Sequence, residues 1–308
     1  MFWRGVKDDA HYVWGEYIPQ QAVKHPFLMH GILAATAMHM SHQQGHRAAH
    51  YLRLSDKHQT VALGVYRSVL ATDINSENAD ALFALASLIS VSAMARACIE
   101  AEAADPPGTM NMESVTEFFF LTRGVRDVIS VTHEHIQRGP MVALFDIQRM
   151  PEGVKVTLPP SVGDQFVAID EMLHSWGLDP DALATCETAL KNLQQVYQTI
   201  VYYAPTQIIE NATVWIWPIQ VPSPFVRLVQ ACCQPALVIF AHFAAIAAAV
   251  RMAWYNQNWS VYAINGVSVA LDESMKHWVD WPRAQAKDLM AVLGVRQPGA
   301  DHKRAGAI

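Results

Sequence analysis

The sequence predicts an all-α protein. Apolar residues recur at helical spacing in one segment after another, strand-like alternation is almost absent, and proline and glycine gather where these segments end. The chain has 308 residues, of which 52% are hydrophobic and 16% charged, so a large core can form without disulfides or metals. Because no disordered linker or internal repeat divides it, we expect one domain over residues 1–296 and a flexible tail at 297–308.

Four helices are expected in the first half of the chain. The first covers residues 26–42 and has Pro26 in its first turn, and the segment from Gln43 to His46 then breaks the pattern. Ser76 is a good N-cap for the helix that includes residues 81–89 and ends before Asp105-Pro-Pro-Gly108. The other two helices are predicted at about 47–70 and 111–131.

The second half begins with its least helical part, at 148–164, where prolines and glycines predict an inserted loop. Asp179 precedes Pro180, a cap followed by a first-turn proline, and predicts a helix that continues to about Tyr203. Residues 215–224 are aromatic and are expected to be irregular. The remaining helices are predicted at about 225–233, 235–257, 259–276 and 283–293.

Charge and hydropathy argue against several classes of partner. A formal net charge of −6 disfavours nucleic acid, which is bound by a basic surface. The longest apolar stretch runs from Pro235 to Val250, short of the roughly 18 residues of a membrane span. The N-terminus lacks the apolar core of a secretory signal, so we expect a cytoplasmic protein. The high apolar fraction suggests an exposed patch and hence a homodimer.

No metal or cofactor is expected. His42, His46 and His50 would share one face of a continuous helix, but Gly45 argues against continuity. The chain shows no glycine-rich phosphate loop, no nucleophile elbow and no paired carboxylates of the kind that hold magnesium. The cysteines are too scattered for a zinc cluster and are expected to be reduced thiols: Cys98, Cys186, Cys232 and Cys233.

Three regions carry a family resemblance. They are His25–His39, the aromatic run Glu117–Asp127 with its Leu-x-Arg-Gly-Val-Arg motif, and a C-terminal set made of 235–243, 254–259 and 278–282. Together they resemble the helical regulatory domain of fungal zinc-cluster transcription factors of the sterol-uptake-control type, over roughly residues 12–290. The resemblance implies a sterol-binding all-α domain that controls an attached DNA-binding module. No six-cysteine cluster is present in this sequence.

The resemblance also implies a pocket among the C-terminal helices, where aromatic residues gather. Candidate ligand-binding residues are Tyr202, Tyr203, Trp215, Trp217, Phe240 and Phe243, together with Phe119. Arg123 and His242 are the candidate catalytic residues, as hydrogen-bond donors to a ligand oxygen. The alternatives are structural: the aromatic residues form core, and Arg123 pairs with Asp127 one helical turn away. His39 and His58 match family histidines and are expected to serve packing and interhelical hydrogen bonds.

Two functions fit these features, and both require a hydrophobic partner that is terpenoid, sterol-like or polyketide. The favoured one is a stand-alone, cofactor-free pericyclase that joins a terpenoid to a polyketide-derived quinone methide, like the hetero-Diels–Alderases of tropolonic sesquiterpene pathways. Holding both partners in one orientation can supply up to about 7–11 kcal/mol of the barrier. It is favoured because a chain that starts at Met1 shows no DNA-binding module. The alternative is a sterol- or lipid-sensing transcription regulator, separated from its zinc cluster and located in the nucleus.

Overall fold

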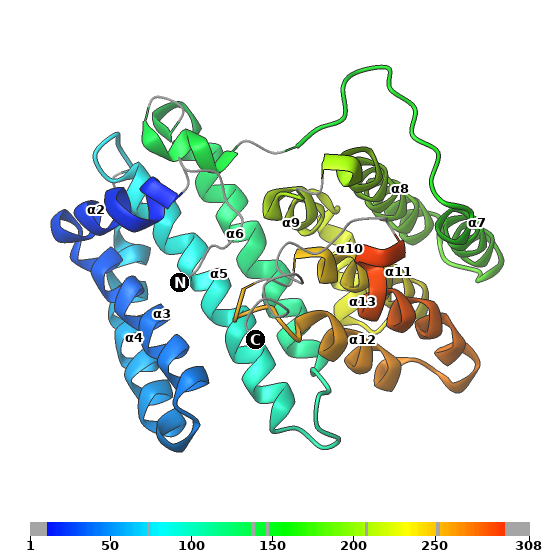
Figure 1. The fold of residues 1–308 in the computed structure, drawn as a ribbon, viewed down its shortest axis with the longest axis horizontal. Helices are drawn as coiled ribbons and strands as arrows, with labels where there is room; N and C mark the ends of the chain where they lie inside the picture. Colours follow the sequence, from blue (N-terminus) through cyan, green and yellow to red (C-terminus); the bar gives the residue numbers. More distant parts are fainter. Residues whose placement is uncertain are drawn as a thin grey trace, which may run out of the picture. The chain divides into compact units, whose positions relative to one another are not determined.

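The computed structural model describes residues 11–72, 74–136, 139–145, 148–206, 209–250 and 253–292. Every regular element in these ranges is helical, which confirms the all-α prediction (Figure 1). Internal contacts divide the chain into unit 1, Met1–Asp146 with Met252–Tyr262, and unit 2, Ile147–Arg251 with Ala263–Ile308. The single domain over 1–296 stays a prediction. The expected tail at 297–308 lies outside the described residues.

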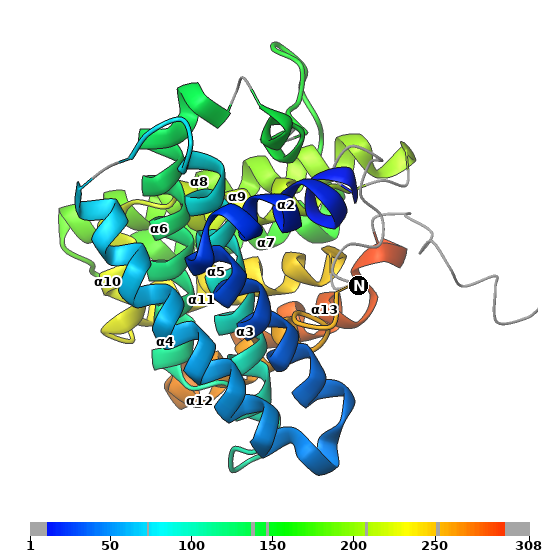
Figure 2. The same ribbon diagram turned by 90° about the vertical axis from the view of Figure 1, so that its left-hand side faces the viewer.

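Unit 1 is built around α5, a long apolar helix that packs against α3 and α6 (Figure 1). Helices α3 and α4 lie side by side as a hairpin (Figure 2). The elements are η1 (Val13–Tyr17), α2 (Ile18–Lys24), α3 (Pro26–Gln43), η2 (Gly45–Arg47), α4 (Ala48–Thr72), α5 (Ala79–Glu102), α6 (Met112–Ile136), η3 (Pro140–Phe145) and the start of α12 (Trp259–Ala270).

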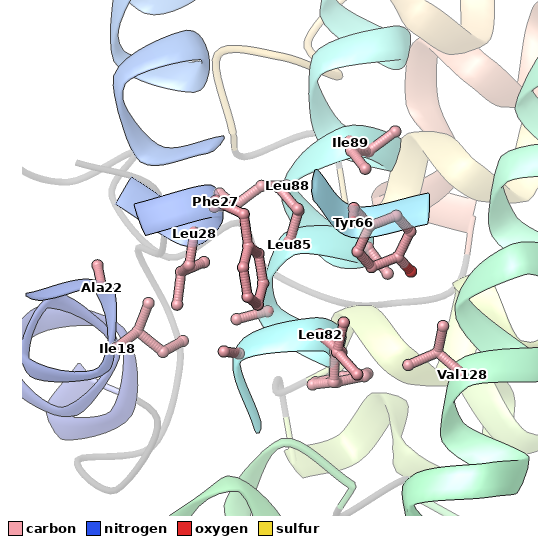
Figure 3. Packing of buried hydrophobic residues seen from close by; sticks show 14 of the residues in the cluster. Ile18, Ala22, Phe27, Leu28, Tyr66, Leu82, Leu85, Leu88, Ile89 and Val128 are labelled. Atoms are coloured by element: carbon pink, nitrogen blue, oxygen red, sulfur yellow. The ribbon is translucent and has the colours of Figure 1, made fainter. Parts of the chain in front are cut away.

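The core of unit 1 joins α2, α3, α5 and α6 through buried aliphatic side chains such as Leu28, Leu82 and Leu85 (Figure 3). Gly31 of α3 permits a close approach to Leu85 of α5. A Cβ atom at this position would lie 2.3 Å from Cδ1 of Leu85, well inside van der Waals contact. The two helices therefore pack backbone to side chain at this point.

Unit 2 is built around α11 (Gln234–Ala247), in which all residues from Pro235 to Ala247 are buried. This helix packs against α7, α8, α9, α10 and α13. The other elements are α7 (Pro160–Ser175), α8 (Pro180–Tyr203), η4 (Ala204–Thr206), α9 (Asn211–Gln220), α10 (Ser223–Gln230), η5 (Ala248–Val250), the remainder of α12, η6 (Glu273–Val279) and α13 (Asp280–Val292).

One described helix, α5, is long and apolar enough to cross a membrane, although 61% of its most apolar stretch is buried inside the protein. Helices α10 and α11 with η5 meet the same test together, but they bend by 105° between them. Such features are also common in core helices, so the expected absence of a membrane span stays a prediction.

Of the two helix caps predicted from the sequence, one is confirmed and the other is wrong. Asp179 caps α8 as predicted, because its carboxylate accepts the backbone N–H groups of Asp181 and Ala182. Ser76 does not cap α5. The side chain of Asn75 accepts the backbone N–H groups of Glu77 and Asn78, which keeps the chain in a turn and delays the helix to Ala79.

Three other predictions were wrong in extent. The segment 215–224 was expected to be irregular, but α9 is helical through Trp215 and Trp217 and contains Pro218. The burial of Trp217 outweighs the one backbone hydrogen bond that a proline removes. Helix α7 begins at Pro160, inside the predicted loop, and the helix expected at 235–257 ends as α11 at Ala247.

Candidate functional site

The aromatic residues of α9 and α11 form the centre of unit 2. Trp217 stacks on Phe243 with 4.5 Å between ring centroids, and Phe225 meets Trp217 edge-on at 5.6 Å. All three are fully buried, and the indole Nε1 of Trp217 donates a hydrogen bond to the carbonyl of Ala189 at 2.9 Å. Trp217 is therefore a structural residue whose polar atom is already satisfied.

Two further candidates join this aromatic centre, and two do not. Trp215 is half-buried and meets Phe243 edge-on at 5.8 Å, and Phe240 lies 6.2 Å from the same ring. Tyr202 and Tyr203 instead form their own edge-on pair at the end of α8, with 5.0 Å between centroids. Trp215 is thus the member of the aromatic set that combines contact with the core and an accessible surface.

His242 lies on α11 and is 1% exposed. Its ring stacks on Trp281 of α13, with 5.1 Å between centroids and 16° between planes. The Nδ1 atom lies 2.8 Å from the carbonyl oxygen of Val238. Because a carbonyl oxygen only accepts hydrogen bonds, Nδ1 carries the proton and donates it. The hydroxyl of Tyr197 donates to the backbone carbonyl of His242 at 3.0 Å.

The other ring nitrogen of His242, Nε2, has no hydrogen-bond partner among the residues that the structure describes. Burial lowers the pKa of His242 to about 4, so the ring is neutral near pH 7. A neutral imidazole protonated at Nδ1 has an unprotonated Nε2, which can only accept. His242 therefore offers a buried acceptor where the sequence analysis expected a donor.

Sequence reasoning missed two residues of α13: Trp281, which contacts the His242 ring, and Gln285, a second buried polar residue. Trp281 stacks on that ring and donates from Nε1 to the carbonyl of Ser161 at 3.1 Å, which fixes the indole. Gln285, one turn further along α13, is 8% exposed, and its Oε1 has no partner within the described part of the chain. The spacing of Trp281 and Gln285 places both on one helix face. Only the packing of α13 on α11 identifies that face.

Arg123 and Phe119 lie on α6, in unit 1. Phe119 is fully buried beside Phe118, with 5.8 Å between ring centroids, so it is a core residue of that unit. Asp127 forms an ion pair with Arg126 at 3.2 Å, and its charge also acts on Arg123, opposing the lowering of the pKa of Arg123 by burial. The participation of Arg123 and Phe119 in a ligand site stays a prediction.

The histidines of unit 1 serve packing. Nδ1 of His30 and Nδ1 of His58 lie 2.9 Å apart and join α3 to α4, which confirms the interhelical hydrogen bond expected for His58. His39 packs its ring 4.7 Å from that of Trp254. His42, His46 and His50 do not share one continuous helix, because they lie on α3, η2 and α4 respectively. In the described ranges, no group of three or more His, Cys, Asp or Glu side chains could hold a metal ion.

A small pocket in unit 1 is lined in part by Trp254. Its volume is about 20 Å³, room for about one water molecule, so it is too small for a sterol. One of its residues is Cys98, and burial raises the pKa of this thiol to about 12, which keeps it protonated and unreactive. The lining residues are His42, Ala95, Cys98, Ile99, Glu102, Trp254, Gln257 and Asn258.

Comparison with known proteins relates this helical chain to transcription factors. A Zn(2)-C6 fungal-type transcription factor of Gibberella zeae is 25% identical over 289 residues, which cover 89% of this chain and 56% of that protein. Sterol uptake control protein 2 of Saccharomyces cerevisiae is 26% identical over 178 residues, or 56% of this chain and 18% of that protein. No family model matches the chain.

These similarities establish a distant relationship to fungal Zn(2)-C6 transcription factors and to a sterol uptake control protein. The chain spans about half the length of the first relative and less than a fifth of the second. Neither relative is described as a cycloaddition enzyme, so the similarity favours the regulator interpretation of the sequence over the pericyclase.

Proposed function

We propose that this chain is a regulatory-type domain that binds a hydrophobic small molecule, of sterol or terpenoid character, among the helices of unit 2. The observation that carries the proposal is the similarity to a Zn(2)-C6 transcription factor along 89% of the chain. The second relative is a sterol uptake control protein, which indicates the class of ligand. Fold alone does not fix function, so the chemistry of the residues in unit 2 decides which ligand suits them.

The chemistry of unit 2 supports an apolar ligand with few polar contacts. Its central helix is buried along its whole length and meets five other helices, so a ligand entering there would contact aromatic and aliphatic side chains. Trp215 adds an aromatic surface that is only half-buried. The chain carries a net charge of −6, which disfavours an anionic ligand.

The pericyclase interpretation stays a prediction without support from the relatives. It requires a donor to polarise a carbonyl or quinone-methide oxygen. His242 cannot serve in that role as a neutral ring with its proton on Nδ1. The other candidate donor, Arg123, lies in unit 1.

Ligand binding to the full chain tests the proposal. We would titrate dehydroergosterol, an intrinsically fluorescent sterol, and farnesol, an open-chain terpenoid, into the purified protein by fluorescence and by calorimetry. Trp215→Ala should weaken the ligand that binds by roughly tenfold, because one aromatic contact is lost. Trp176→Ala is the matched control in the same unit, since Trp176 is 40% exposed and lies outside the aromatic centre. Absence of saturable binding by both probes would refute the proposed ligand class.

A regulatory role also implies a nuclear location, whereas the sequence alone suggested the cytoplasm. Imaging of the full chain as a fluorescent fusion in a filamentous fungus distinguishes the two, and exclusion from the nucleus under all sterol conditions would contradict the regulator. The absence of DNA binding and the homodimer both stay predictions. Gel-shift and sedimentation experiments at physiological salt address them.

A further inference from the structure

We infer that His242 selects the ligand of unit 2 by accepting a hydrogen bond from a hydroxyl group, so that alcohols bind and the corresponding carbonyl compounds do not. This inference rests on the proposed function and adds to it the polar group that the ligand must carry. It reverses the polarity expected from the sequence, in which His242 would donate to a ligand oxygen.

The imidazole ring of His242 is held in one tautomer. Val238 lies one turn before His242 on α11, and its carbonyl oxygen holds the Nδ1 proton at 2.8 Å. The stacked indole of Trp281 restricts rotation of the ring, and Trp281 is itself held by its hydrogen bond to Ser161. Nε2 is therefore kept in one place as an unprotonated acceptor.

Nε2 of His242 has no donor within the described chain, although His242 is only 1% exposed. Buried polar atoms in proteins almost always have partners, and an unpartnered one marks a place where a water molecule or a ligand binds. The neighbouring helix α13 carries a second buried acceptor of the same kind, Oε1 of Gln285. Each of these two atoms lacks a donor among the described residues, although the amide nitrogen of Gln285 itself carries two N–H groups.

The donor to Nε2 could be a ligand hydroxyl or a trapped water molecule. Buried waters typically make about three hydrogen bonds, and in some of these bonds the water oxygen is the acceptor. The described contacts of the His242 ring are the stacked indole of Trp281, whose Nε1 donates to Ser161, and the carbonyl of Val238, and neither offers a donor to a water oxygen. A hydroxyl on an apolar skeleton needs only one acceptor for its single proton. The site therefore fits a neutral alcohol better than a water.

The experiment compares alcohols with their carbonyl counterparts, which match them in size but have no donor. The probes are dehydroergosterol with its 3-oxo counterpart and farnesol with farnesal, and these two pairs distinguish a sterol from an open-chain terpenoid. In the wild-type protein we expect the alcohol of the preferred pair to bind roughly tenfold or more tightly, because the carbonyl would leave Nε2 unpaired. In His242→Phe, which keeps the stacking on Trp281, this ratio should fall to about one.

His174→Gln is the control variant, because His174 is an exposed residue of α7 with a side chain 55% accessible, and it should keep the wild-type ratio. Equal binding of alcohol and carbonyl compound to the wild-type protein would overturn the inference while leaving the proposed function intact. So would a ratio that survives in His242→Phe. If neither pair binds at all, the proposed function fails and the inference falls with it.

A measurement on the wild-type protein replaces the variant if His242→Phe does not fold. The ¹⁵N resonance of His242 Nε2 should show an unprotonated nitrogen in the free protein and should shift when the alcohol is added. The carbonyl probe should leave it unchanged. An Nε2 that already carries a proton in the free protein would contradict the fixed tautomer and overturn the inference.

Discussion

The central helices of the two units satisfy the hydrogen bonds of their polar side chains to different extents. In α5 of unit 1, Ser87 and Ser90 donate their hydroxyl protons to backbone carbonyls one turn earlier, at 3.0 and 3.2 Å. In α11 of unit 2, His242 does the same with Nδ1. A serine has used its only proton in this way, whereas an imidazole keeps a second polar atom. The remaining nitrogen gives α11 a buried acceptor without a partner among the described residues.

The side chains that surround these two helices also differ in type. The core of unit 1 is mainly aliphatic (Figure 3), and α3 approaches α5 at Gly31. The core of unit 2 is aromatic, with stacked and edge-on rings from α9, α10 and α11. Substitutions in unit 1 therefore test how helices pack. Substitutions in unit 2 test how an ionisable side chain is accommodated among apolar neighbours.

The largest effect is expected from Trp217→Ala in the aromatic core of unit 2. The change removes a fully buried indole, its stacking on Phe243 and its hydrogen bond to Ala189. We expect the free energy of unfolding to fall by about 3–5 kcal/mol. Urea denaturation measures it, and Trp217→Phe should lose much less. Nearly unchanged stability in the alanine variant would show that Trp217 is not a core residue.

The next effect concerns pH and His242. The folded pKa of about 4 is below the unfolded value of 6.5, so the unfolded chain binds the proton more readily. This group's contribution to stability is present above about pH 6.5 and is lost as the pH falls through 4, by about 3 kcal/mol in total. Unfolding at pH 7 and pH 4.5 in the wild type and in His242→Phe isolates it, since other groups titrate in both. Equal pH slopes would place a solvated histidine at this position.

A smaller effect is expected in unit 1 at Gly31. The added methyl group of Gly31→Ala would overlap Leu85 and force the side chain of Leu85 or helix α3 to move. Overpacking of this kind typically costs about 1–3 kcal/mol, partly offset by the better helix propensity of alanine, about 1 kcal/mol. The variant Gly31→Ala with Leu85→Val should recover part of the loss, and thermal unfolding provides the measurement.

The smallest effect has the opposite sign. Gly124 lies on α6, and nothing lies within 4 Å of a Cβ built at this position. Gly124→Ala should therefore stabilise the protein by about 0.5–1 kcal/mol, through helix propensity alone. A loss of stability in this variant would show that the exposed face of α6 is covered in solution, for example by the second copy of a homodimer.

The sequence by itself determined the helical class, the break after α3 and the start of α8, because periodicity, turn residues and the Asp179 cap act within a few residues. It also located the aromatic candidates. Only the tertiary structure decided that residues 215–220 are helical, because the burial of Trp217 against Ala189 outweighs Pro218. Likewise, the protonation of His242 depends on burial, and the position of Trp281 beside α11 depends on packing between segments that are far apart in the chain. Such contacts leave no local pattern in a sequence.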